Sequence, residues 1–135
     1  MNSDTYSYVI DTHTLVWYLS DWQKLGREAQ EIFEKIEKGN AIALIPAIVL
    51  AEIVFLAQKK RIRSTLENTL SRIESSDNFK IIFMDLAIIK KLVELQKIPE
   101  MHDRIIVATS LVSNAVLVTK DEQITKSGIV KTLWK

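Results

Sequence analysis

Short runs of apolar residues alternate along the chain with longer segments in which apolar residues recur at helical spacing. The short runs are typical of buried strands, and they lie at residues 8–10, 41–45, 79–84, 116–118 and 129–133. The helical segments follow residue 11 and then cover about 27–38, 47–59, 66–73, 86–96 and 105–112. This alternation predicts an α/β domain in three layers, with a mainly parallel sheet of four to five strands between helices.

Composition limits the classes of protein to be considered. The 135 residues, 47% hydrophobic and 26% charged, suit one globular domain over residues 1–135. The formal net charge of +1 gives no strong overall field toward nucleic acid or membrane, although a local basic groove stays open. The chain has no cysteine, and its two histidines, His13 and His102, are too few for a histidine-rich zinc site.

Neither a leader nor a membrane segment is expected from the sequence. The first residues, MNSDTYSY, lack the basic and then apolar segments of a signal peptide. The longest apolar stretch, residues 41–57, is interrupted by Pro46 and Glu52, so it is too broken for a membrane span. We therefore expect a soluble cytoplasmic protein.

Glu52 is the most conspicuous carboxylate, because it interrupts an apolar helical segment. The helix at 47–59 is apolar nearly all round and is expected to be buried. On that helix Glu52 shares one face with Val49 and Ile53. A buried carboxylate without a partner costs several kcal/mol, on the order found in real proteins after relaxation. Glu52 therefore needs a basic partner or a pocket open to water, and these two interpretations stay equally open.

Three aspartates lie at strand ends or at a helix start. Asp11 directly follows the first predicted strand, Asp121 follows the strand at 116–118, and Asp103 precedes the helix at 105–112. In open α/β sheets, functional residues lie just beyond the carboxyl ends of the strands. Aspartate also caps helices and forms turns, and for each residue alone this structural role is the more common one.

The other aspartates are interpreted structurally. Asp85 follows a predicted strand, but it precedes a regular amphipathic helix and nothing else singles it out, so we expect a helix cap. Asp4, Asp21 and Asp77 lie in polar segments and are assigned to turns or solvent.

The combination of Asp11, Glu52, Asp103 and Asp121 indicates more than any member does. In a parallel sheet all four can reach one crevice at the carboxyl edge. Carboxylates gathered there repel one another unless a cation or a proton is present. Oxygen ligands without cysteine favour Mg²⁺ or Mn²⁺, and such ions stabilise the attacking and leaving oxygens in displacement at phosphorus. The residues thus predict a metal-dependent phosphodiesterase site.

Four segments are distributed along nearly the whole length of the chain: VIDTHTLVWYL, PAIVLAEIVFL, HDRIIVATSL and LVTKDEQI. In this order the sequence resembles the PIN-domain family, and most closely its VapC-type ribonuclease toxins. The resemblance implies a PIN-like fold and a metal-binding role for each of the four acids, with Thr119 as a supporting hydroxyl. It further implies an endoribonuclease that uses Mg²⁺ or Mn²⁺ to cleave single-stranded regions of RNA.

The same resemblance implies protein partners. A toxin of a type II toxin–antitoxin pair would have a cognate antitoxin that blocks the acidic crevice, and it would form a homodimer. The alternative is a non-catalytic PIN-fold module that binds RNA or protein. A phospho-accepting receiver domain is disfavoured, because it normally has paired acids after the first strand, where this chain has Asp11 followed by Thr12 and His13.

Some polar and aromatic residues have two interpretations that the sequence leaves open. The basic residues Lys59, Lys60, Arg61 and Arg63 suit a solvated helix end better than a phosphate-binding patch. Arg104 is expected to form a structural salt bridge or to contact phosphate. His13 is expected to be exposed at a helix start, whereas Trp17 is expected to pack in the core.

Overall fold

A five-stranded parallel sheet forms the centre of the computed structural model, which describes residues 6–135. The strands are β1 (Tyr6–Ile10), β2 (Ala41–Pro46), β3 (Phe79–Ile82), β4 (Val116–Val118) and β5 (Thr132–Leu133). Their order in the sheet is β3-β2-β1-β4-β5, and each neighbouring pair is parallel. The order reverses direction between β1 and β4, which is the place where open α/β sheets form a crevice.

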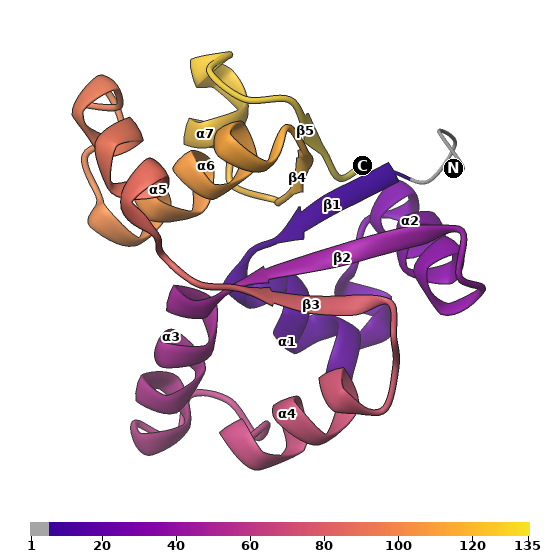
Figure 1. Ribbon diagram of the computed structural model, residues 1–135. Coiled ribbons are helices and arrows are strands. Elements are labelled where there is room, and N and C mark those ends of the chain that lie inside the picture. Colours follow the sequence, from indigo (N-terminus) through magenta and orange to yellow (C-terminus); the bar gives the residue numbers. More distant parts are fainter. Residues whose placement is uncertain (1–5) are drawn as a thin grey trace.

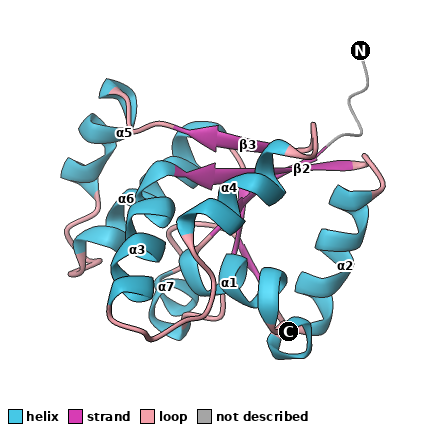
Figure 2. Cartoon of the chain, turned by 90° about the horizontal axis from the view of Figure 1, so that it is seen from below, coloured by secondary structure: helices cyan, strands magenta, loops and turns pink. Residues whose placement is uncertain are grey.

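Helices cover the sheet on both sides. They are α1 (Thr12–Ser20), α2 (Arg27–Glu37), α3 (Ala47–Gln58), α4 (Leu66–Glu74), α5 (Leu86–Lys91), α6 (Met101–Ser113) and α7 (Glu122–Ser127), with short 3₁₀ turns η1 (Trp22–Lys24) and η2 (Leu92–Glu94). In Figure 1, α3 and α4 lie below strands β1–β3, whereas α5, α6 and α7 lie above them. The view in Figure 2 shows α1, α3 and α4 in front of the sheet. The predicted α/β class and mainly parallel sheet are confirmed.

Several elements differ from the sequence prediction, and β5 covers only the last part of the strand predicted at 129–133. Helix α7 is not predicted, because its six residues carry too few apolar positions to show a period; Ile124 is its only buried residue. Strand β3 ends at Ile82, so Phe83 and Met84 lie outside the sheet. The helix predicted at 86–96 ends at Lys91 and continues only as η2. Asp4 lies outside the described residues.

The core explains why the strands appear in the sequence as continuous apolar runs. Val9 and Ile10 of β1, and Ala43 and Ile45 of β2, have no exposed surface, because helices cover both faces of these central strands. The expectation for α3 is wrong. Only Val49, Ile53 and Leu56 are buried on this helix. Its outer face is open, and Phe55 there is 51% exposed.

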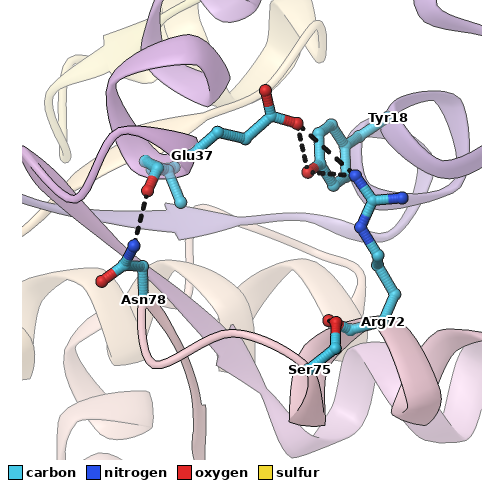
Figure 3. A network of polar contacts seen from close by, with 6 residues as sticks. Tyr18, Glu37, Arg72, Ser75 and Asn78 are labelled. Carbon is cyan, nitrogen blue, oxygen red and sulfur yellow. Dashed lines mark hydrogen bonds and ion pairs between the residues drawn. The ribbon is translucent and has the colours of Figure 1, made fainter.

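A polar network joins α1, α2 and α4 near the end of the sheet where β2 and β3 begin (Figure 3). The Tyr18 hydroxyl donates to Glu37 Oε2 at 2.8 Å and accepts from Arg72 Nη2 at 3.0 Å. Burial, and then the bond to Glu37, raises the pKa of Tyr18 to about 12. The Tyr18 ring stacks on Phe33 with centroids 4.1 Å apart. Hydrogen bonding and packing therefore fix α1 at this end.

Tyr18→Phe is expected to lower the free energy of unfolding by about 1 kcal/mol, because it removes two hydrogen bonds but keeps the stacked ring. Urea unfolding measures this change. Tyr8→Phe is the matched control: Tyr8 is equally buried, at 8% against 7% exposure. Its hydroxyl has no hydrogen bond with another residue in the range 6–135. Equal losses in the two variants would contradict a role for the network.

Within residues 6–135, no helix is long and apolar enough to cross a membrane.

Candidate functional site

A cleft of about 700 Å³ lies at the carboxyl ends of β1 and β4, the neighbouring strands at which the strand order reverses. Asp11, Glu52, Asp103 and Asp121 all line it. They come from the end of β1, the second turn of α3, the first turn of α6 and the segment before α7. In Figure 1 the arrowheads of β1 and β2 point toward this side of the molecule, where α3 and α6 begin. The sheet topology thus brings together residues that are far apart in sequence.

Asp11 caps α1 and also faces the cleft. Its Oδ1 accepts the backbone N–H of Thr14 at 3.1 Å, as an N-cap does, and its Oδ2 accepts the hydroxyl of Thr119. Burial raises the pKa of Asp11, and the hydrogen bonds from Thr119 and Thr14 act in the opposite direction. The capping role and the cleft position are therefore compatible, and one does not exclude the other.

Thr119 connects Asp11 to Asp121. The Thr119 side chain is 1% exposed, and while its hydroxyl donates to Asp11 it accepts the backbone N–H of Asp121 at 3.0 Å. The Asp121 carboxylate caps α7 through Ile124 N–H at 2.9 Å. A single buried hydroxyl therefore holds two of the acidic residues in register across β1 and β4.

Glu52 lies in a partly open environment. The Thr12 hydroxyl donates to its Oε1 at 2.8 Å, and Thr12 is itself 4% exposed. Of the lysine and arginine residues in the range 6–135, none lies within ion-pair distance of the Glu52 carboxylate. Of the two interpretations of Glu52, the structure favours a pocket open to water.

Asp103 differs from the expected cap. Helix α6 begins at Met101, and its N-cap is Glu100, whose carboxylate accepts the backbone N–H of Asp103 at 3.2 Å. The Asp103 carboxylate has no hydrogen bond with any residue from 6 to 135. Burial, followed by repulsion from Asp121, Glu100, Asp11 and Glu52, raises the pKa of Asp103 to about 6. The helix uses Glu100 as its cap, so the Asp103 side chain has no structural role of this kind.

The donor chemistry of the cleft suits a hard divalent cation. The four predicted site residues that line it are carboxylates, and repulsion from acidic neighbours contributes, after burial, to the raised pKa of Asp103. Within residues 6–135, no three acidic or histidine side chains already lie close enough to enclose an ion. A bound divalent cation would therefore require the acidic side chains to approach one another.

The sequence did not point to Glu100 or Lys120, which also line the cleft. Glu100 is paired with His102, Oε2 to Nδ1 at 2.8 Å; this contact lowers the pKa of Glu100 and raises that of His102. Lys120 lies with Nζ 5.6 Å from the Trp17 ring centroid. Glutamate is a less favoured N-cap than aspartate or serine, so nothing in the sequence indicated Glu100 as the cap of α6. Lys120 adjoins Asp121, but a lysine beside an aspartate is too common in sequences to indicate a site.

Arg104 and Trp17 differ in part from their expected roles. Arg104 donates through Nε to the backbone carbonyl of Ile98, which holds the segment before α6, and no carboxylate within residues 6–135 lies within ion-pair distance of it. Trp17 is half-buried: it packs against the core but also lines the cleft, with His13 and Trp134 rings each 5.8 Å from its own. His13 is exposed near the start of α1, as expected.

Comparison with protein families identifies the fold. The PIN domain family matches residues 8–129. The chain belongs to the PIN-domain family. No curated protein gives a significant sequence match.

Solved structures share the architecture of this PIN domain. The structure of VapBC2 from Rickettsia felis bound to a DNA fragment from the promoter gives a TM-score of 0.71 at 19% identity, over 96% of this chain and 99% of that one. The structure of VapBC-1 from nontypeable Haemophilus influenzae gives a TM-score of 0.64 at 18% identity, over 94% of this chain and 96% of that one. A domain of a protein of unknown function from Methanocaldococcus jannaschii gives a TM-score of 0.61 at 20% identity, over 97% of this chain and 91% of that one.

Proposed function

We propose that this PIN domain is a metal-dependent endoribonuclease and the toxin of a type II toxin–antitoxin pair. The observation that carries the proposal is the convergence of Asp11, Glu52, Asp103 and Asp121 in one cleft at the switch point of the sheet. A module that only binds RNA gains nothing from acids that repel phosphate. The similarity in fold to chains of VapBC complexes supports the same assignment.

The four acids and two threonines have defined parts in this mechanism. Asp11 and Asp103 would hold Mg²⁺ or Mn²⁺ directly, and Glu52 and Asp121 would bind it directly or through water. When bound, the ion lowers the pKa of a water molecule and offsets negative charge on the scissile phosphate. Thr12 orients the Glu52 carboxylate. Thr119 donates to the Asp11 carboxylate and accepts the backbone N–H of Asp121, so its hydroxyl fixes these two residues relative to each other.

The deciding experiment is incubation of a mixed pool of small RNAs with the protein and Mn²⁺ or Mg²⁺, against the same reaction with EDTA. We expect products only with metal, and their ends identify the bond that is cleaved. RNA binding that survives chelation, with no product over a long incubation, would instead support the non-catalytic binding module.

Exposed apolar side chains support protein partners for this domain. Phe83, Leu86 and Val93 are 73%, 63% and 71% exposed, and all lie in the segment from the end of β3 to η2. Large exposed apolar surfaces mark interaction sites. We propose a cognate antitoxin that closes the acidic cleft and a homodimer that covers this apolar segment.

The homodimer is tested by light scattering of the purified chain. We expect twice the monomer mass for wild type and the monomer mass for Leu86→Glu/Val93→Glu, because two buried charges would oppose association. The matched control is Phe55→Glu, which changes another exposed apolar residue on a different helix. A wild-type monomer at micromolar concentration would contradict the homodimer.

A further inference from the structure

A second cavity, of about 670 Å³, continues directly from the acidic cleft. His13, Trp17 and Glu52 line both spaces, so the two form one connected groove. From this junction the second cavity runs between α1 and the segment that follows α3. The half-buried Trp17 lies where the acidic cleft and the second cavity meet. We call this second cavity the basic groove.

Lys24, Lys60, Arg61 and Arg63 line the basic groove, and all four side chains are exposed. Within residues 6–135, none of them lies within ion-pair distance of a carboxylate. The groove contains one aspartate, Asp21, besides Glu52 at the junction. Its own walls therefore have a net positive charge, in a chain whose overall net charge is only +1.

The backbone after α3 adopts an unfavourable conformation that presents these cations. Lys60 has φ +56°, in the left-handed region, where glycine is the usual residue at the end of a helix. Lys60 N–H donates to Ala57 O at 3.0 Å and Arg61 N–H donates to Leu56 O at 2.9 Å, which is the hydrogen-bond pattern of a Schellman motif. Lysine does not favour this left-handed backbone conformation as glycine would. Its charged side chain therefore gives a better explanation for lysine at position 60 than the turn does.

We propose that the basic groove binds the phosphodiester backbone of the RNA substrate on one side of the scissile phosphate. This inference rests on the proposed function, because it takes the acidic cleft as the place of cleavage. Unpaired lysine and arginine side chains contact phosphates without reading sequence. An acidic protein segment that followed the same path would approach Glu52 and the other cleft carboxylates, which disfavours it as the occupant.

The first test measures binding without cleavage. Fluorescein-labelled single-stranded RNA of mixed sequence is titrated with Asp103→Asn protein, with and without Arg61→Ala/Arg63→Ala. We expect the double variant to weaken binding on the order of tenfold, and to lower the slope of log affinity against log salt by roughly 0.7 for each phosphate that is no longer bound. Lys35→Ala/Lys38→Ala, on the exposed side and end of α2, removes the same charge outside the groove and is expected to leave binding unchanged.

The second test distinguishes the effect of the Lys60 charge from the effect of the backbone conformation at this position. Lys60→Gly relieves the left-handed backbone and removes the cation, so it should keep or raise the melting temperature while weakening RNA binding. Asn114→Gly relieves the same kind of backbone, at φ +52° after α6, and should leave RNA binding unchanged. Normal RNA binding by Lys60→Gly and by the double arginine variant would overturn the proposal.

A competition experiment distinguishes RNA from an acidic protein segment. If polyglutamate displaces labelled RNA as well as unlabelled RNA of equal charge does, the groove is not a phosphodiester site and the proposal fails. The proposed nuclease has a separate readout. If wild type binds RNA through the groove but never cleaves it, the nuclease proposal is refuted and the groove proposal stands. If wild type cleaves RNA but the groove variants bind RNA as well as wild type does, the groove proposal is refuted and the nuclease proposal stands.

Discussion

Asp103→Asn is expected to lower the rate of RNA cleavage in Mn²⁺ on the order of 10³-fold or more, while the protein stays folded. The carboxylate of Asp103 makes no hydrogen bond with a described residue, so its replacement removes no structural hydrogen bond. Its negative charge is the property that the metal requires, and asparagine of the same shape lacks it. Initial rates on one labelled RNA, with circular dichroism of each variant, measure the effect.

Asp85→Asn provides the matched control for this loss of activity. Asp85 also follows a strand and caps the next helix, through Ile88 N–H at 3.0 Å, but it does not line the cleft. Asparagine caps helices as well as aspartate does, so Asp11→Asn and Asp85→Asn should both keep their caps. We expect Asp11→Asn to be inactive and Asp85→Asn to be active. Near wild-type cleavage by Asp103→Asn would remove the basis for the proposed site.

The local pattern around Asp11, Asp85 and Asp121 could not separate a cap from a cleft residue. All three follow strands, and all three cap the helix that comes next. Sequence periodicity predicts strands and helices because it depends on burial, and it placed Asp11 and Asp121 at strand ends for that reason. Whether such an end faces the cleft depends on strand order, since β1 and β4 are neighbours at the switch point and β3 is an edge strand.

Other features depend on contacts that no single segment contains. The hydroxyls of Thr12 and Thr119 reach Glu52 and Asp11 across 40 and 108 positions of sequence. The outer face of α3 is as apolar as a buried face, so hydropathy could not show that Phe55 is exposed. The basic residues after α3 resemble a solvated helix end in the sequence, and only the fold places Lys60, Arg61 and Arg63 beside the cleft.

Stability without metal is expected to fall as the pH rises through the pKa of the Asp103 carboxyl. The ordinary pKa of this group is 3.8 and its pKa in the folded chain is about 6, so between these values the folded protein binds more protons than the unfolded one. The unfolding free energy contributed by this group is therefore fully present below its unfolded pKa and is lost as the pH rises through about 6. Because Asp103 is only half-buried, we expect a loss of about 1 kcal/mol.

Comparison of wild type with Asp103→Asn isolates this effect from other groups, because the raised pKa of His102 changes stability in the same direction. In urea unfolding with EDTA, the variant should be more stable than wild type at about pH 7.5 and similar to it at about pH 4. Mn²⁺ should raise the melting temperature of wild type at the higher pH and have little effect on the variant, since a bound cation would offset the repulsion between the ionised carboxylates. Equal stabilisation of both proteins by Mn²⁺ would place the metal elsewhere and refute Asp103 as its ligand.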